Sequence, residues 1–237
     1  MNLKFLVLVI FFINLSVGFS QENNKYLVTY IEKRIVSENQ MKKFESFPIF
    51  LKSKLLKEIN LGEEKILFLD NKTSFYSLKD DVKKTKENGV SKQILTLSDY
   101  YKDFKNNCLI ITRNAGEEEY VIKEKLHPFK WELKNETKKI NSMICKKAIS
   151  IDAKGREIIA WYTETIKIPN GPFEYGGLPG LIVELKSKYK SFELKKIEKT
   201  NTKEKIDFPS LKNAITMEDF KKEFNPKNSV KKSVRYN

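Results

Sequence analysis

The chain has 237 residues and a formal net charge of +14, and 40% of its residues are hydrophobic. This length and hydrophobic content are enough for one domain or two small ones with a substantial core. Only four of its 45 basic residues are arginine. This balance argues against a nucleic-acid binder, because phosphate and base recognition favour the bidentate arginine side chain. Most lysines are expected on solvated faces, although a weak attraction to anionic envelope lipid or polysaccharide stays open.

Residues 1–20 are typical of a cleaved signal peptide. Lys4 precedes an apolar run over residues 5–17, and Gly18 and Ser20 place small residues before a cleavage site at Gln21. The apolar run is shorter than the roughly 20 residues that a spanning helix needs. We therefore expect a periplasmic or secreted chain with no transmembrane span after cleavage. An uncleaved N-terminal anchor is the alternative.

Residues 21–237 are expected to form a single β-rich domain, because apolar, β-branched and aromatic runs recur along them. The strand segments, in chain order, are 26–36, 65–69, 74–78, 108–112, 119–126, 130–133, a hairpin over 144–165, 181–185 and 189–197. Residues 94–104 fit neither the helical nor the strand period cleanly. Two of the runs flank Asp70–Thr73, which has the residues of a hairpin turn.

Helical signals are confined to two places. Residues 37–60 carry apolar side chains at three- and four-residue spacing, and Pro48 must open or break any helix there, so we expect a short helical or irregular connection. Within residues 210–237, Thr216 and Asp219 resemble a capping box that opens a short helix, and the rest of this segment is expected to be frayed.

The backbone is most constrained over residues 169–180, which hold four of the nine glycines and three of the seven prolines. We expect an ordered, tightly turned loop that leads into the strand 181–185. The residues expected to carry this structural motif, with the preceding hairpin turn and two charged neighbours, are Gly155, Arg156, Gly171, Pro172, Gly176, Gly177, Leu178, Pro179, Gly180 and Glu184. Arg156 and Glu184 either form a partly buried pair or lie on two solvated edges.

Catalytic signals are scarce. The single histidine, His127, cannot build a paired-histidine zinc site, and the chain has no Gly-x-Ser-x-Gly elbow for a nucleophile. The glycine-rich segment lacks the Gly-Lys-Ser/Thr ending of a phosphate loop. We therefore expect no metal, no cofactor and no catalytic residue, and carboxylate pairs such as Glu174 with Glu184 are attributable to chance among 31 acidic residues.

Two features leave alternatives open. Cys108 and Cys145 are either two separate buried thiols, which we favour, or a disulfide in an oxidising compartment. Four aromatic residues gather near the glycine-rich segment, namely Trp161, Tyr162, Phe173 and Tyr175. The favoured interpretation is a hydrophobic core, and the alternative is a docking surface for a lipid, a peptide or a glycan.

Residues 146–185, KKAISIDAKGREIIAWYTETIKIPNGPFEYGGLPGLIVEL, resemble the signature block of the GLPGLI family of exported proteins, named for the residues that stand here at 177–182. Residues 67–78 are similar to its early hairpin, and Trp131, Ile140 and residues 145–148 to its middle segment. Residues 141–143 depart from the pattern, which usually has a glycine and an aromatic residue before the cysteine, and Cys108 is not part of it. The resemblance implies a secreted or periplasmic protein of Gram-negative envelopes and brings no established activity, cofactor or catalytic residue.

The sequence thus predicts a mostly β fold with a minor α component. We expect a single curved antiparallel sheet of about nine to eleven strands, half-barrel in shape, with two or three short helices on its concave face. A small closed β-barrel is the alternative. The expected function is non-catalytic binding, in the concavity, of an apolar or extended ligand, with an envelope protein, peptide or lipid as partner. A carboxylate-dependent hydrolase of the cell envelope is the alternative.

Overall fold

The computed structural model describes residues 24–78, 98–115, 118–126, 129–201 and 206–223. The predictions for the signal peptide, for His127 and for the tail after Glu223 lie outside these residues.

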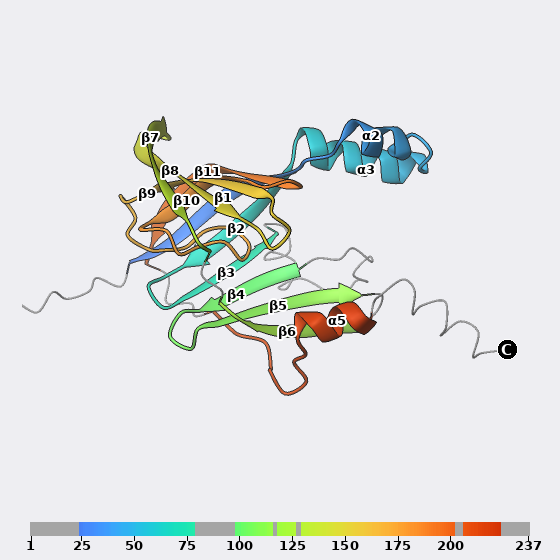
Figure 1. Ribbon diagram of the computed structural model, residues 1–237. Coiled ribbons are helices and arrows are strands. Elements are labelled where there is room, and N and C mark those ends of the chain that lie inside the picture. Colours follow the sequence, from blue (N-terminus) through green and yellow to red (C-terminus); the bar gives the residue numbers. More distant parts are fainter. Residues whose placement is uncertain (1–23, 79–97, 116–117, 127–128, 202–205, 224–237) are drawn as a thin grey trace, which may run out of the picture.

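Eleven strands form one antiparallel sheet (Figure 1). They are β1 (Lys25–Arg34), β2 (Glu63–Leu69), β3 (Thr73–Leu78), β4 (Ser98–Asp103), β5 (Cys108–Ala115), β6 (Glu118–Lys125), β7 (Glu132–Ile140), β8 (Met143–Ile151), β9 (Glu157–Thr163), β10 (Leu181–Lys186) and β11 (Lys190–Thr200). Their order in the sheet is β6-β5-β4-β3-β2-β1-β11-β10-β9-β8-β7. The mostly β prediction is confirmed. The outermost strands, β6 and β7, are not neighbours, so the closed barrel is wrong.

The sheet consists of two meanders, β1–β6 and β7–β11, that meet where β1 pairs with β11. Register shifts interrupt the ladder between Thr29 and Tyr30 and again between Ile182 and Glu184. Such bulges bend a strand and increase its local twist. The twist turns the two meanders into the two arms of a curved sheet (Figure 1).

Three short helices accompany the sheet within the described residues: α2 (Glu38–Phe44), α3 (Ile49–Asn60) and α5 (Met217–Glu223). Ser37 and Gln40 form a capping box at the start of α2, and Pro48 caps α3, so the proline opens a helix here. The helices do not share a concave face as expected. The α2–α3 hairpin projects from the end of β1 and β2, and α5 lies beside β6 (Figure 1).

The predicted start of α5 is present. The hydroxyl of Thr216 accepts a hydrogen bond from the Asp219 backbone N–H at 3.1 Å and donates one to the Asp219 carboxylate at 2.7 Å. The ring of Phe220 packs edge-on against Tyr120 at 5.5 Å between centroids, which holds α5 against β6.

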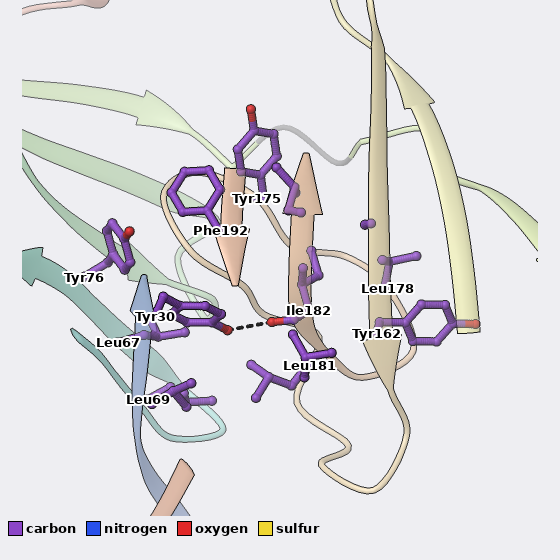
Figure 2. Packing of buried hydrophobic residues seen from close by; sticks show 14 of the residues in the cluster. Tyr30, Leu67, Leu69, Tyr76, Tyr162, Tyr175, Leu178, Leu181, Ile182 and Phe192 are labelled. Atoms are coloured by element: carbon purple, nitrogen blue, oxygen red, sulfur yellow. Dashed lines mark hydrogen bonds between the residues drawn. The ribbon is translucent and has the colours of Figure 1, made fainter. Parts of the chain in front are cut away.

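The core lies on the inner face of the sheet, where the segment between β9 and β10 packs against both meanders. Figure 2 shows side chains from each part: Tyr30, Leu67, Leu69 and Tyr76 from the first meander, and Tyr162, Tyr175, Leu178, Leu181, Ile182 and Phe192 from the second meander and its connecting segment. The Tyr30 hydroxyl donates to the Ile182 carbonyl at 2.5 Å, which ties the central strand β1 to β10 (Figure 2).

Candidate functional site

The loop at residues 169–180 is built from close backbone contacts. Gly177 N–H donates to the Pro169 carbonyl at 3.0 Å, and the Ile182 N–H donates to the Asn170 carbonyl at 2.8 Å. A Cβ on Gly180 would lie 2.0 Å from the Thr163 carbonyl oxygen, so only glycine fits there. The loop is therefore pressed against the end of β9.

A buried lysine holds this loop to the sheet. Lys102 of β4 is 2% exposed, and its ammonium donates to the Asn170 side-chain oxygen at 2.9 Å and to the carbonyls of Gly171 at 3.0 Å and Tyr175 at 2.6 Å. We call these four residues the loop clamp. Burial lowers the pKa of Lys102 to about 7, while the nearby carboxylate of Glu174 raises it. Three acceptor oxygens match the three N–H groups of the charged form, so the lysine ties the loop to β4.

Sequence reasoning missed Lys102, because a lysine in the segment SDYYKD has the appearance of a solvated residue. The only local signal is that Tyr100 and Lys102 share one face of β4. The acceptors lie about 70 positions further along the chain, and no local pattern reveals them.

Beside the clamp, Phe173 adopts a left-handed backbone with φ of 57°, which costs a non-glycine residue free energy. Its ring lies 4.1 Å from that of Tyr100, and the Lys190 ammonium stands 4.2 Å from its centroid. Lys190 also forms an ion pair with Glu32, whose carboxylate accepts a hydrogen bond from Tyr76 at 3.0 Å. These contacts hold the strained residue in place.

Glu174 follows Phe173 and is half-buried. Burial raises the pKa of its carboxyl, while its own backbone and then the cations Lys102, Lys190 and Arg113 act in the opposite direction. Burial likewise raises the pKa of Tyr100 above its usual value. A carboxyl with a raised pKa beside an amine with a lowered one is an arrangement that acid–base catalysts use.

The outer face carries a different feature, a depression of about 240 Å³ that we call the Trp161 depression. Its lining residues come from three adjacent strands, β9, β10 and β11, and are Ile159, Trp161, Glu184, Leu185, Lys186, Ser191, Phe192 and Glu193. The half-exposed indole of Trp161 gives the depression an apolar wall, and the neighbouring strands supply charged and hydroxyl groups.

Charges in the depression are arranged in pairs. Glu184 and Glu193 stand opposite each other on β10 and β11. Lys138 of β7 forms an ion pair with Glu184 and lies 4.5 Å from the Trp161 ring, and Lys33 of β1 is 3.2 Å from Glu193. The like charges are thus separately neutralised.

Of the two alternatives for Arg156 and Glu184, the direct pair is wrong, because Arg156 binds Asp152 and Glu184 binds Lys138. The Arg156 guanidinium binds Asp152 at 2.5 Å across the hairpin turn, where Gly155 takes a positive φ of 73°. The Arg156 guanidinium holds the pKa of the Asp152 carboxyl down at about 2.

The four aromatic residues proposed as a ligand surface do not form one surface. Trp161 and Tyr162 are neighbours on a strand and face opposite sides of the sheet. Tyr162 and Tyr175 are buried in the core, and Phe173 is half-buried against Tyr100. Trp161 alone among the four lines the depression.

The cysteines are both free and buried, so the alternative of a disulfide is wrong. Cys108 is on β5 and Cys145 on β8, and seven strands separate these two in the sheet. Burial raises the pKa of both thiols, which makes them poor nucleophiles. In the part of the chain that the structure describes, no three histidine, cysteine or acidic residues are grouped to hold a metal ion.

Comparison with known proteins adds a shared fold and a short match to a family model of unknown function. The family described as "Protein of unknown function (Porph_ging)" matches residues 151–184, which include the hairpin turn and the loop. None of the curated proteins matches the chain.

Two solved structures of PNGF-II, in space groups C2 and P21, are similar to 76% of the chain with TM-scores of 0.53 and 0.54. Sequence identity is 17% in both, and the matched part spans only 28% and 29% of those longer chains. The likeness therefore establishes a shared β-rich fold.

Proposed function

We propose that this is an exported protein of the GLPGLI kind that binds an extended ligand in the cell envelope without transforming it. The signal-peptide pattern of residues 1–20 supports export, and the signature block at residues 146–185 supports the family. The match over residues 151–184 falls within that block.

One observation carries the proposal: the half-exposed Trp161 beside a 240 Å³ depression on rigid strands. Binding sites combine an apolar or aromatic wall with a few fixed polar groups. Glu184, Glu193 and Ser191 supply such groups, and ladder hydrogen bonds fix the strands that carry them. A ligand with an apolar face and hydrogen-bonding edges suits this surface.

The ligand position differs from the concavity that the sequence suggested. Leu178 and Tyr175 fill the inner face with buried side chains of the chain itself. This packing counts against an apolar ligand inside the concavity, so the outer face is the better candidate.

Trp161 provides its own test. The Trp131→Phe variant leaves Trp161 as the single tryptophan, so its fluorescence reports the depression alone. We expect one of three probes, a fatty acid, an extended hexapeptide or a hexasaccharide, to shift or quench this emission saturably. The Trp161→Phe variant, which reports Trp131 instead, should show no change. Absence of a response to all three probes, or an equal response in the control, contradicts the proposal.

A second candidate function rests on Glu174. A half-buried carboxyl with a raised pKa beside Lys102 and Tyr100 is the perturbed acid that an envelope hydrolase needs. Hydrolysis of ester and glycoside chromogens by the wild type, lost in Glu174→Gln and retained in the exposed control Glu164→Gln, supports this candidate. No turnover by the wild type removes it.

A further inference from the structure

The tip of the α2–α3 hairpin exposes a run of large apolar side chains. Exposed fractions are 37% for Phe47, 87% for Ile49, 76% for Phe50 and 39% for Leu51. We call residues 47–51 the apolar tip. No residue of α2 or α3 is buried, so the hairpin does not serve the core.

The hairpin carries the tip away from the sheet. Twelve residues of α3 span about 18 Å at 1.5 Å per residue. The helix pair projects from the sheet without folding back over either face (Figure 1). The rings of Phe44 and Phe47 lie 5.5 Å apart, which joins the end of α2 to the tip.

Positive charge surrounds the tip. Lys42 and Lys43 stand in the last turn of α2, and Lys52 and Lys54 follow the tip in α3. Glu45 is the single acidic residue in the sequence from 42 to 54. Among the described ion pairs, none involves these four lysines.

We propose that the apolar tip inserts into the surface of an anionic lipid bilayer, with the four lysines against the headgroups. Short apolar segments flanked by lysine enter the headgroup boundary, where the apolar side chains leave water and the ammonium groups meet negative charge. No helix among the described residues has the length and apolar character needed to cross a bilayer. A second copy of the chain is the poorer occupant, because its own tip is also basic and the two tips would repel each other.

Co-sedimentation with lipid vesicles tests the proposal. The protein is expressed as the full chain and purified after the cell has carried out its own processing. Vesicles of phosphatidylcholine with 30% phosphatidylglycerol are compared with pure phosphatidylcholine, and we expect binding to the anionic vesicles to be at least tenfold tighter. Ile49→Ser with Phe50→Ser should weaken binding at least tenfold. Lys42→Ser with Lys43→Ser should weaken it about fivefold for each lysine.

Matched controls come from the strand β8 and from the connections that follow β8 and β9. Ile144 and Ile151 are 70% and 59% exposed, and Lys154 and Lys167 are also exposed. The paired serine variants at these positions should bind within twofold of the wild type. Equal loss in the controls, equal binding to both vesicles, or no binding overturns the proposal. So does sedimentation velocity that shows a dimer lost in the Ile49→Ser, Phe50→Ser variant, because the tip then binds a second copy.

Discussion

Two connections between strands treat their apolar side chains in opposite ways. The segment between β9 and β10 buries Leu178 and Tyr175 and accepts hydrogen bonds from the buried Lys102. The α2–α3 hairpin between β1 and β2 has no fully buried residue in either helix and presents Ile49 and Phe50 to solvent. The two connections therefore have different roles. The β9–β10 segment, which carries the sequence signature, stabilises the fold, whereas the α2–α3 hairpin is exposed and free to contact a partner.

The strongest test of this contrast is Lys102→Met. The substitution leaves the buried carbonyls of Gly171 and Tyr175 without the lysine donor, while the Asn170 oxygen keeps the Gly171 backbone N–H. Two buried acceptors left unsatisfied cost about 4 kcal/mol together, at about 2 kcal/mol each. We expect urea unfolding to show that loss. Lys105→Met, at an exposed position after β4, should change the free energy of unfolding by less than about 0.5 kcal/mol. Similar values for the two variants would mean that the loop clamp is not a structural element.

The next test compares two glycines three residues apart in the loop. Gly180→Ala forces a Cβ onto the Thr163 carbonyl and should cost about 3 kcal/mol. Gly177 has a φ of 85° and open space around it, so Gly177→Ala should cost only about 1 kcal/mol, from the backbone conformation. Thermal and urea unfolding of both variants measure the difference. The reverse ranking would show that the contact with β9 is not tight.

A pH series tests the lowered pKa of the buried Lys102. The pKa of Lys102 falls from its ordinary value of 10.5 to about 7 in the fold, so between these values the unfolded chain binds more protons. The free energy of unfolding should therefore rise with pH, by at most about 1.4 kcal/mol per pH unit. The Lys102→Met variant should lack this contribution. Measurement between about pH 7 and pH 9.5 avoids the buried tyrosines, whose raised pKa values act in the opposite direction above about pH 10. An identical slope in both proteins would contradict the assignment.

The smallest effect is expected at the hairpin. The Ile49→Ser, Phe50→Ser variant removes side chains that are mostly in water, so the free energy of unfolding should change by less than about 0.5 kcal/mol. Differential scanning calorimetry beside the wild type measures this. A large loss would show that the apolar tip packs against the protein, and the contrast with the loop would fail.

Most of the sheet could be predicted from the sequence, because many strands either alternate apolar and polar residues or consist of continuous apolar runs. This holds for β2, β3, β5 and β8–β11. β7 was mostly missed, since ELKNETKKI is charged throughout, as suits an edge strand that resists further pairing. β4 was ambiguous because one of its buried positions is the lysine of the loop clamp.

The candidate sites were less accessible. The sequence singled out Trp161 and Glu184, but the choice of Lys138 as the partner of Glu184 depends on how β7 lies against β10 across the sheet. The acceptors of Lys102 likewise come from a loop that is distant in sequence. Such pairings follow from tertiary arrangement, which local periodicity does not encode.

The pairing of β1 with β11 has a consequence for how the chain assembles. β1 is the first strand to leave the ribosome, and β11 is the last of its sheet neighbours to follow. Until then one side of β1 presents unpaired backbone groups, a template for the wrong strand. Each meander closes from adjacent hairpins, whereas the joint between them requires residues about 160 positions apart to meet. A chain interrupted before Lys190 therefore lacks β11 and also lacks the strand pairing that joins the two meanders.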